Sequence, residues 1–544
     1  MARYAYERLS PQDNDFLLWE RPGLCMHTAG TQIFRAGPLA RPDGGIDFAA
    51  IRRATERVLH RVPRYRQKLR WIPGTRQAVW VDDGHFNLDF HMRHTALPRP
   101  GNERQLKRLS ARIMEQPLDL SRPLWETWVV EGLEGGCFAT INKLHHCMLD
   151  GSAGIVLSQI MMSRRPDAAP DPSEVPRWLP RPEPSDSELR RHERLHGLLA
   201  PVRSAARLAS FLRDSADRVG DVGRRLRALE GMALWKLRPA SETPLGGPVG
   251  PHRIFEWTTL PLEDVKQMRR AAGCKLNDVV LAIVTGAVRD FMKRRGVRPE
   301  KLDFRVSMPV DVRQEEERSR ISGNRVSSWL LRLPLGEADP VARLSAIRRE
   351  TQALKDSRQA EVIELVNAIH EWLPIDVQGF ARGTMNTIVT NVPGPPFPLY
   401  LCGAELLAIY PQAPLLEDIG LVTGVISYNG RLCWGFNADY DRVPDLDAYV
   451  AGVNHAFLEL AEALGVPTSG PIARLTHPLE GVDREAGHEA DHASDHRLSD
   501  RELRERDVPG DVSVEEEASE TDHRECNPPS HARPQSRAGG CAAG

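Results

Sequence analysis

Seven residues, His145-His146-Cys147-Met148-Leu149-Asp150-Gly151, follow an apolar, strand-like run from Cys137 to Leu144 and read HHxxxDG. An imidazole titrates near physiological pH, so a histidine here can take a proton from an alcohol and return it to a leaving group. Asp150 could hold the tautomer of the ring or tie the turn to a neighbouring strand. Gly151 permits a backbone conformation that a side chain forbids. The motif therefore predicts a general base on a turn at the end of a strand.

The residues around the motif narrow its chemistry. Cys147 lies next to the histidines, but no Gly-x-Ser-x-Gly elbow and no cysteine-protease context surrounds it, which favours direct transfer without a covalent enzyme intermediate. Adjacent residues on a strand point to opposite faces, and no Cys-x-x-Cys accompanies the pair, so we predict no metal. A purely structural histidine pair is the alternative that the motif alone leaves open.

Length and composition set the scale. The chain has 544 residues, 41% of them hydrophobic, which predicts two domains plus additional segments. The formal net charge of −2 argues against a nucleic-acid partner. Its eight cysteines lack the spacing of a disulfide framework, and its first residues lack the apolar core of a signal peptide. We therefore expect a cytoplasmic protein with no transmembrane helix.

Apolar periodicity divides the chain into four parts. Residues 1–165 mix helical and strand patterns and contain the motif, and residues 251–468 repeat that mixture. Between them, residues 166–250 form a linker rich in proline and charge, followed by a helical crossover. Residues 469–544 are predicted to be disordered, because the chain from Pro471 onward has 17 acidic and 9 basic residues and no aromatic ones.

The crossover contains a long helical pattern at residues 187–237. Its leucines and valines are spaced by three, four or seven, and residues 188–238 include 12 basic and 6 acidic side chains. Such a basic amphipathic helix can lie on an anionic lipid surface, where each Lys or Arg contributes about 1 kcal/mol. The alternative is a helix that crosses between domains and whose apolar stripe is ordinary core.

Four further motifs accompany HHxxxDG. They are Leu9-Ser10-Pro11-Gln12-Asp13 with Phe16, Pro123-Leu124-Trp125, Asn277-Asp278 at the start of an apolar run, and Thr390-Asn391-Val392-Pro393-Gly394-Pro395. HHxxxDG alone is shared by the chloramphenicol acetyltransferase-like superfamily, which includes the condensation domains of peptide synthetases. With these companions, residues 8 to about 465 resemble the bacterial wax ester synthase/diacylglycerol acyltransferase family.

The resemblance implies an α/β fold with mixed sheets. Two chloramphenicol acetyltransferase-like subdomains, joined by the helical crossover, would form a substrate channel at their interface. By position, His146 is then the general base, His145 a supporting residue, and Asp150 with Gly151 the structural part of the turn. Asn277 and Asp278 are implied to lie near the active site, and Pro123, Leu124 and Trp125 are associated with the channel.

The implied reaction is O-acyl transfer from acyl-CoA to a diacylglycerol, giving a triacylglycerol, or to a long-chain alcohol, giving a wax ester. His146 would remove the hydroxyl proton, and acyl-CoA is the co-substrate, with no further cofactor. Asn277 could donate to the oxyanion, or it could cap or pack a helix instead. We expect peripheral attachment to the inner membrane face or to lipid inclusions. The alternatives are a condensation-type enzyme that uses carrier-bound thioesters and a non-catalytic lipid-droplet protein.

Overall fold

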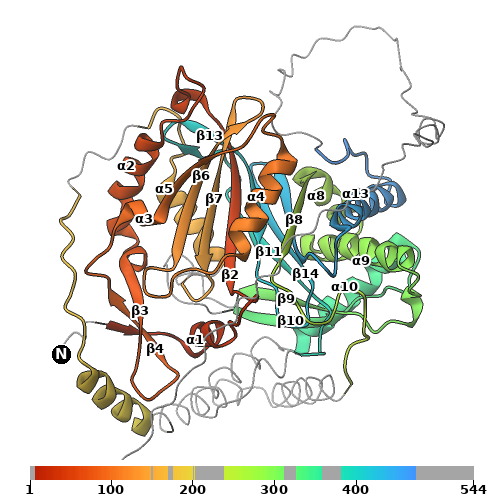
Figure 1. Cartoon of the computed structure of the whole chain (residues 1–544). Helices are drawn as coiled ribbons and strands as arrows, with labels where there is room; N and C mark the ends of the chain where they lie inside the picture. Colours follow the sequence, from red (N-terminus) through yellow and green to blue (C-terminus); the bar gives the residue numbers. More distant parts are fainter. Residues whose placement is uncertain are drawn as a thin grey trace, which may run out of the picture. The chain divides into compact units, whose positions relative to one another are not determined.

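Two six-stranded sheets organise the protein (Figure 1). A computed structural model describes residues 6–148, 151–168, 175–199, 201, 238–311, 326–357 and 382–472. Asp150, residues 202–237 of the predicted crossover helix and residues 473–544 of the predicted tail lie outside this description.

The first sheet, here called the N-sheet, is built around the strand that precedes the motif. Its spatial order is β12 (Tyr400–Leu401), β13 (Ala404–Gln412), β2 (His27–Arg35), β7 (Cys137–His145), β6 (Trp125–Leu133) and β5 (Met92–Ala96). All neighbours are antiparallel except β5 and β6. In β7 alternate side chains point to opposite faces, and each face contributes apolar residues to a different hydrophobic cluster, while Thr140 and Asn142 form a polar patch with Gln32 of β2.

Helices cover both faces of the N-sheet. On one face, Ala139 and Ile141 pack beneath α4 (Glu103–Glu115), which begins with a capping box between Asn102 and Gln105. On the other, Phe138 and Leu144 share a core with α5 (Gly151–Met161), which lies against α2 (Phe48–Val58). The helix that begins at Gly151 therefore returns across the sheet from which the motif emerges.

The second sheet, the C-sheet, has the order β10 (Val326–Arg332), β9 (Arg305–Asp311), β11 (Thr387–Pro393), β14 (Leu421–Tyr428), β15 (Arg431–Asp439) and β8 (Arg253–Pro261). The neighbours β9, β11 and β14 are parallel. One large core joins this sheet to four helices, of which the central one is mostly buried and has an apolar middle from Val279 to Val288. They are α8 (Leu262–Ala271), α9 (Leu276–Arg294), α10 (Pro340–Ser357) and α13 (Leu446–Ala463).

The remaining elements support the N-terminal part. A small sheet has the order β1 (Tyr6–Arg8), β4 (Ala78–Asp82) and β3 (Gln67–Trp71), and two short helices are α1 (Pro11–Leu18) and α3 (Leu88–His91). In the described part of the chain, no single helix combines the length and apolar character of a membrane span, although α8 and α9, bent by 101° at their junction, meet both criteria together.

Residues from the second half of the chain complete the first sheet. Strands β12 and β13 fall within the predicted C-terminal subdomain, residues 251–468, yet β13 pairs with β2 in the N-sheet. The predicted subdomain boundary therefore does not separate the two sheets. β13 also lies against the C-sheet, where glycines allow the backbones to approach closely. A Cβ atom at Gly435 would come within 2.0 Å of the carbonyl oxygen of Pro411.

Candidate active site

The two histidines of the motif differ in exposure. Strand β7 ends at His145, which is fully buried, and the following turn carries His146, which is half-buried. The backbone N–H of His145 donates to the carbonyl of Leu124 at 3.0 Å, and that of His146 donates to the carbonyl of Met26 at 2.8 Å. The turn is thus fastened on both sides, and only the second ring is open to a substrate.

The ring of His145 is held by two contacts. Its Nδ1 accepts a hydrogen bond from the backbone N–H of Cys147 at 3.1 Å, which places the ring proton on Nε2. Nε2 lies 3.2 Å from Oε1 of Glu20. The His145 side chain therefore braces the turn from inside.

Glu20 is a site residue that the sequence did not reveal. Its Oε1 also accepts from the backbone N–H of Met26 at 2.9 Å and lies 3.7 Å from Nε2 of His27. His27 is directly opposite His145 in the β2–β7 register. Burial, together with the positive charge of nearby Lys143, holds the pKa of His27 well below its usual range, so this ring stays neutral. A strand prediction for residues 27–35 would have brought His27 to the site.

An aromatic side chain from the N-terminal motif lies on the predicted base. Phe16 stacks on the ring of His146 with centroids 4.2 Å apart. Ser10 caps α1 by accepting from the N–H of Asp13 at 3.0 Å, and Pro11 occupies the first turn, where no N–H is needed. The Leu9-to-Asp13 motif thus starts the helix that presents Phe16 to His146.

Cys147 is a poor nucleophile in this setting. Its side chain is buried, and that burial raises the pKa of the thiol well above its usual value. Because the thiolate is the reactive form, a thiol that stays protonated does not form an acyl intermediate readily. This agrees with the predicted direct transfer.

Within the described ranges, one group of side chains has the proximity of a metal site. Ligand atoms of Glu20, Cys25 and His27 all lie within 4.8 Å of one another. Burial and the carboxyl of Glu20 raise the pKa of the Cys25 thiol, which disfavours the thiolate that a metal requires. Oε1 of Glu20 already accepts a backbone hydrogen bond. We interpret the group as a hydrogen-bonding cluster.

One HExxH pattern in the sequence also bears on the prediction of no metal. It runs from His192 to His196 in the helical residues 186–199. There Glu193 forms an ion pair with Arg8, and Nδ1 of His192 is 2.8 Å from the hydroxyl of Tyr6. These contacts fasten the helix to β1 and engage the glutamate that zinc hydrolysis would need as a base.

The second-half motifs meet at the seam between the sheets. Nδ2 of Asn391, on β11, donates to Oδ1 of Asn277, on the first turn of α9, at 2.8 Å. Val392 belongs to the same hydrophobic cluster as Cys147 and Met148. The bond uses the carbonyl oxygen of Asn277, so its amide N–H groups are the ones that could donate to a substrate.

Asp278 has a structural place. It is 2% exposed and accepts from the backbone N–H of Lys275 and from the hydroxyl of Thr351, both at 2.8 Å. The first bond caps α9 and the second joins it to α10. Asp278 therefore supports the position of Asn277 without itself facing a substrate.

The Pro123-Leu124-Trp125 segment is core. Trp125 is 1% exposed, stacks on Tyr65 at 4.3 Å and on His91 at 4.6 Å, and donates from Nε1 to the carbonyl of Tyr65 at 2.9 Å. Leu124, fully buried, supplies the carbonyl that binds the N–H of His145. These residues hold in place the end of β7 that carries His145.

Comparisons with known proteins identify relatives of this chain. Residues 9–280 match the wax ester synthase/diacylglycerol acyltransferase catalytic domain, and residues 322–461 match the WS/DGAT C-terminal domain. A relative named as a diacylglycerol O-acyltransferase in Mycobacterium tuberculosis is 32% identical over 475 residues, 84% of this chain and 91% of the relative. Another, from Mycobacterium bovis, is 30% identical over 84% of this chain and 99% of the relative.

Solved structures confirm the predicted fold. The wax ester synthase/diacylglycerol acyltransferase from Marinobacter aquaeolei VT8 has a TM-score of 0.59 and 24% identity, and covers 84% of this chain and 100% of its own. The first condensation domain of the calcium-dependent antibiotic synthetase has a TM-score of 0.57 and 16% identity, and covers 86% of this chain and 98% of its own. At these identities the likeness concerns the fold.

Proposed function

Because the chain belongs to the wax ester synthase/diacylglycerol acyltransferase family, we propose that His146 is the general base of its acyl transfer. The enzyme is an acyl-CoA-dependent O-acyltransferase of triacylglycerol or wax ester synthesis. The observation that carries the proposal is the difference between the two rings. His145 is locked and buried, whereas His146 is half-buried on a turn fastened to two strands.

The reaction needs few groups. As the acceptor oxygen bonds to the thioester carbon, His146 takes the hydroxyl proton. The tetrahedral intermediate then collapses, its C–S bond breaks, and the departing CoA sulfur takes the proton from the imidazolium. General-base help contributes about 10²–10⁴ in rate, so positioning of both substrates must supply more.

Asn277 is our candidate for stabilising the oxyanion. Asn391 binds its carbonyl oxygen and so orients the amide, which leaves Nδ2 as the donor. Removing one preorganised donor of this kind costs about 10²–10³ in kcat. Asn391 lies on β11, and β11 contacts α5, the helix that follows the motif, so the Asn277–Asn391 pair is near the motif.

The test compares variants of three histidines. His146→Ala should lose almost all ester formation from labelled acyl-CoA, assayed with hexadecanol and with diacylglycerol and read by lipid chromatography. The matched control is His252→Ala, because the His252 side chain is exposed. His145→Ala should lose activity together with thermal stability. Full ester formation by His146→Ala would overturn the assignment of the base. If the wild-type protein made product only from a carrier-bound thioester, the condensation-type alternative would hold.

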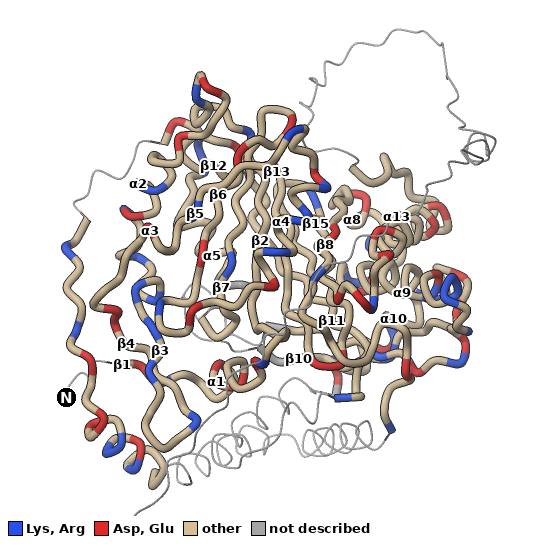
Figure 2. Tube along the Cα trace, in the orientation of Figure 1, with Lys and Arg blue, Asp and Glu red and all other residues tan. Residues whose placement is uncertain are grey.

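We also propose that the helix at residues 186–199 contacts a lipid surface. It is the olive helix of Figure 1, and Figure 2 shows basic positions along it. Leu195, Leu198 and Leu199 are 53%, 74% and 54% exposed. Exposed apolar side chains beside arginines are the pattern of an interfacial helix on anionic lipid.

Vesicle flotation tests this contact. The wild-type protein should float with vesicles of phosphatidylcholine mixed with phosphatidylglycerol, and Leu198→Gln/Leu199→Gln should reduce the floating fraction several-fold. Leu120→Gln, on an exposed leucine elsewhere, is the control. Equal flotation of the leucine variant and the wild type would refute the contact.

A further inference from the structure

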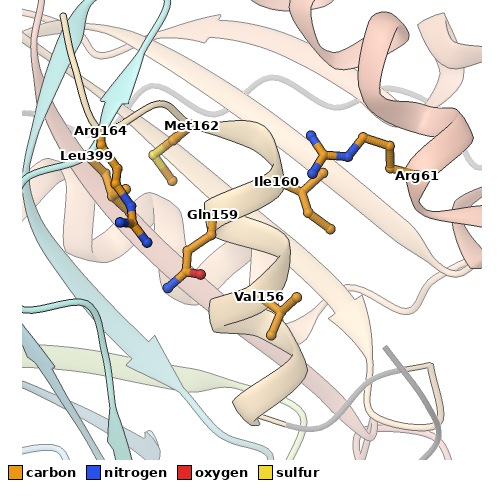
Figure 3. A pocket seen from close by; sticks show the side chains of 7 residues that line it. All are labelled: Arg61, Val156, Gln159, Ile160, Met162, Arg164 and Leu399. Carbon is orange, nitrogen blue, oxygen red and sulfur yellow. The ribbon is translucent and has the colours of Figure 1, made fainter. Parts of the chain in front are cut away.

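The far end of the motif helix borders a cavity. Its volume is about 260 Å³, and α5 contributes Val156, Gln159 and Ile160 to its wall (Figure 3). Sites that hold a whole drug-sized ligand measure roughly 300–1,000 Å³. The cavity therefore suits one part of a larger molecule whose remainder lies outside it.

Two arginines make this cavity basic. Arg61 and Arg164 both line it, and Figure 3 shows their guanidinium groups flanking the last turns of α5 from two sides. Among the residues that the structure describes, neither has an ion-pair partner. The guanidinium of Arg164 lies 4.1 Å above the ring of Phe397, which fixes its direction without neutralising it.

The chain segment around Arg61 is also rich in basic residues. Between residues 52 and 66 there are six arginines and one acidic residue; of these arginines, Arg52 pairs with Glu56 and Asp89, and Arg64 pairs with Glu7. Guanidinium groups without carboxylate partners are the usual protein ligands of phosphate, because their planar donors match its oxygens. The two arginines therefore indicate an anionic ligand of the phosphate type.

The length of α5, which separates the cavity from the motif, is similar to the length of coenzyme A between its diphosphate and its sulfur. α5 has 11 residues and begins at Gly151, so it is about 16 Å long at 1.5 Å per residue. In coenzyme A, the arm from the diphosphate oxygen to the sulfur has as many bonds as four extended residues, which span about 14 Å. A phosphate at this cavity could thus place a thioester near the motif.

We propose that Arg61 and Arg164 bind the nucleotide phosphates of the acyl-CoA donor at this cavity. The inference rests on the proposed function, and it assigns the side of the motif from which the thioester approaches His146. Ile160 and Leu399 give the site an apolar wall beside the cations. The phosphate of a phospholipid headgroup has the same chemistry, and the experiment separates the two sources.

The experiment compares two donors that share one acyl chain. One is acyl-CoA, and the other is acyl-pantetheine, which lacks the nucleotide phosphates. For Arg61→Ala/Arg164→Ala we expect the ratio of kcat/KM for acyl-CoA to that for acyl-pantetheine to fall about tenfold or more, because the charged hydrogen bonds to the phosphates are lost. The control Arg104→Ala/Arg108→Ala removes two exposed arginines of α4 and should keep the wild-type ratio.

The outcomes are distinct. If the wild-type protein transfers no acyl group from acyl-CoA, the proposed function fails. If it does, and the arginine variant keeps the wild-type donor ratio, the phosphate site is refuted. An unchanged ratio with reduced binding to phosphatidylglycerol vesicles would assign the cavity to a lipid headgroup. A charge reversal, Arg61→Glu/Arg164→Glu, should lower the ratio further, and a ratio equal to the wild type would also count against the site.

Discussion

Replacing Glu20 tests whether the turn that carries His146 is held from beneath. Glu20→Ala removes the oxygen that accepts from the N–H of Met26 and faces Nε2 of His145. Glu20→Gln keeps an oxygen that can occupy the same place and removes only the negative charge. The pair of variants therefore separates hydrogen bonding from charge.

The contacts of Glu20 determine how much stability and activity its variants should lose. Glu20→Ala removes the acceptor of the buried Met26 N–H, and an unsatisfied buried donor costs about 1–3 kcal/mol, so the free energy of unfolding should fall by roughly that amount. A displacement of the base by about 1 Å costs on the order of 10² in rate, which is the loss of kcat/KM that we expect. Glu20→Gln should lose less than about tenfold, because the geometry is retained.

Steady-state acyl transfer and urea denaturation measure the two quantities on the same preparations. Glu134→Ala, on an exposed glutamate in the β6–β7 turn, is the control for removing a carboxyl group. Wild-type kcat/KM in Glu20→Ala would refute the role of Glu20. Equal damage in both variants would show that the charge of Glu20, and not its hydrogen bonding, holds the ring of His145.

Four other outcomes can be checked in the same way. Trp125→Ala should lower the free energy of unfolding by about 3–5 kcal/mol in urea denaturation, and Trp125→Phe by less, since it keeps the stacking and loses only the bond to Tyr65. Asn277→Ala and Asn391→Ala should each lower kcat. In the double variant, the loss of transition-state stabilisation should differ from the sum of the two single losses by about 1 kcal/mol, because the two side chains share a hydrogen bond. A loss equal to the sum would contradict their coupling. Burial lowers the pKa of His27 in the folded state. As the pH falls below about 6.5, the unfolded chain therefore takes up a proton before the folded protein does, and the free energy of unfolding decreases. In His27→Gln the free energy of unfolding should decrease less between about pH 7 and pH 5. Gly435→Ala should lower the thermal midpoint, because its Cβ would meet the oxygen of Pro411 at 2.0 Å, and an unchanged midpoint would contradict the close approach.

Regular apolar patterns made much of the fold predictable. The apolar run at residues 138–144 is typical of a strand and lies within β7, the run at 421–428 is typical of a strand and is β14, and the run at 276–293 has helical spacing and is α9. Each of these elements is buried on at least one face, so its apolar residues follow the period of its structure. His145 and His146 could be placed because they directly follow such a strand.

Long-range pairing made the rest unpredictable. β2 has a polar face, in which Gln32 accepts from Thr140 of β7 at 3.1 Å, so its alternation does not read as an ordinary strand. The apolar spacing from Leu260 to Met268 is typical of a helix, yet Leu260 and Pro261 are the end of β8, and α8 begins only at Leu262. Glu20 and His145 lie far apart in the sequence and meet only when β2 and β7 pair. No local pattern indicates such a contact.

The large sequence separation between β2 and its partner β13 has a consequence for synthesis on the ribosome. When β7 emerges, its neighbour β2 still lacks its other partner, which is encoded more than 260 residues later. At about 5–20 residues per second, the interval is tens of seconds. During that time β2 offers an unpaired edge, which other chains could join. The nascent N-terminal half should therefore depend on chaperones, and a chain cut before residue 404 should aggregate even though it contains both histidines.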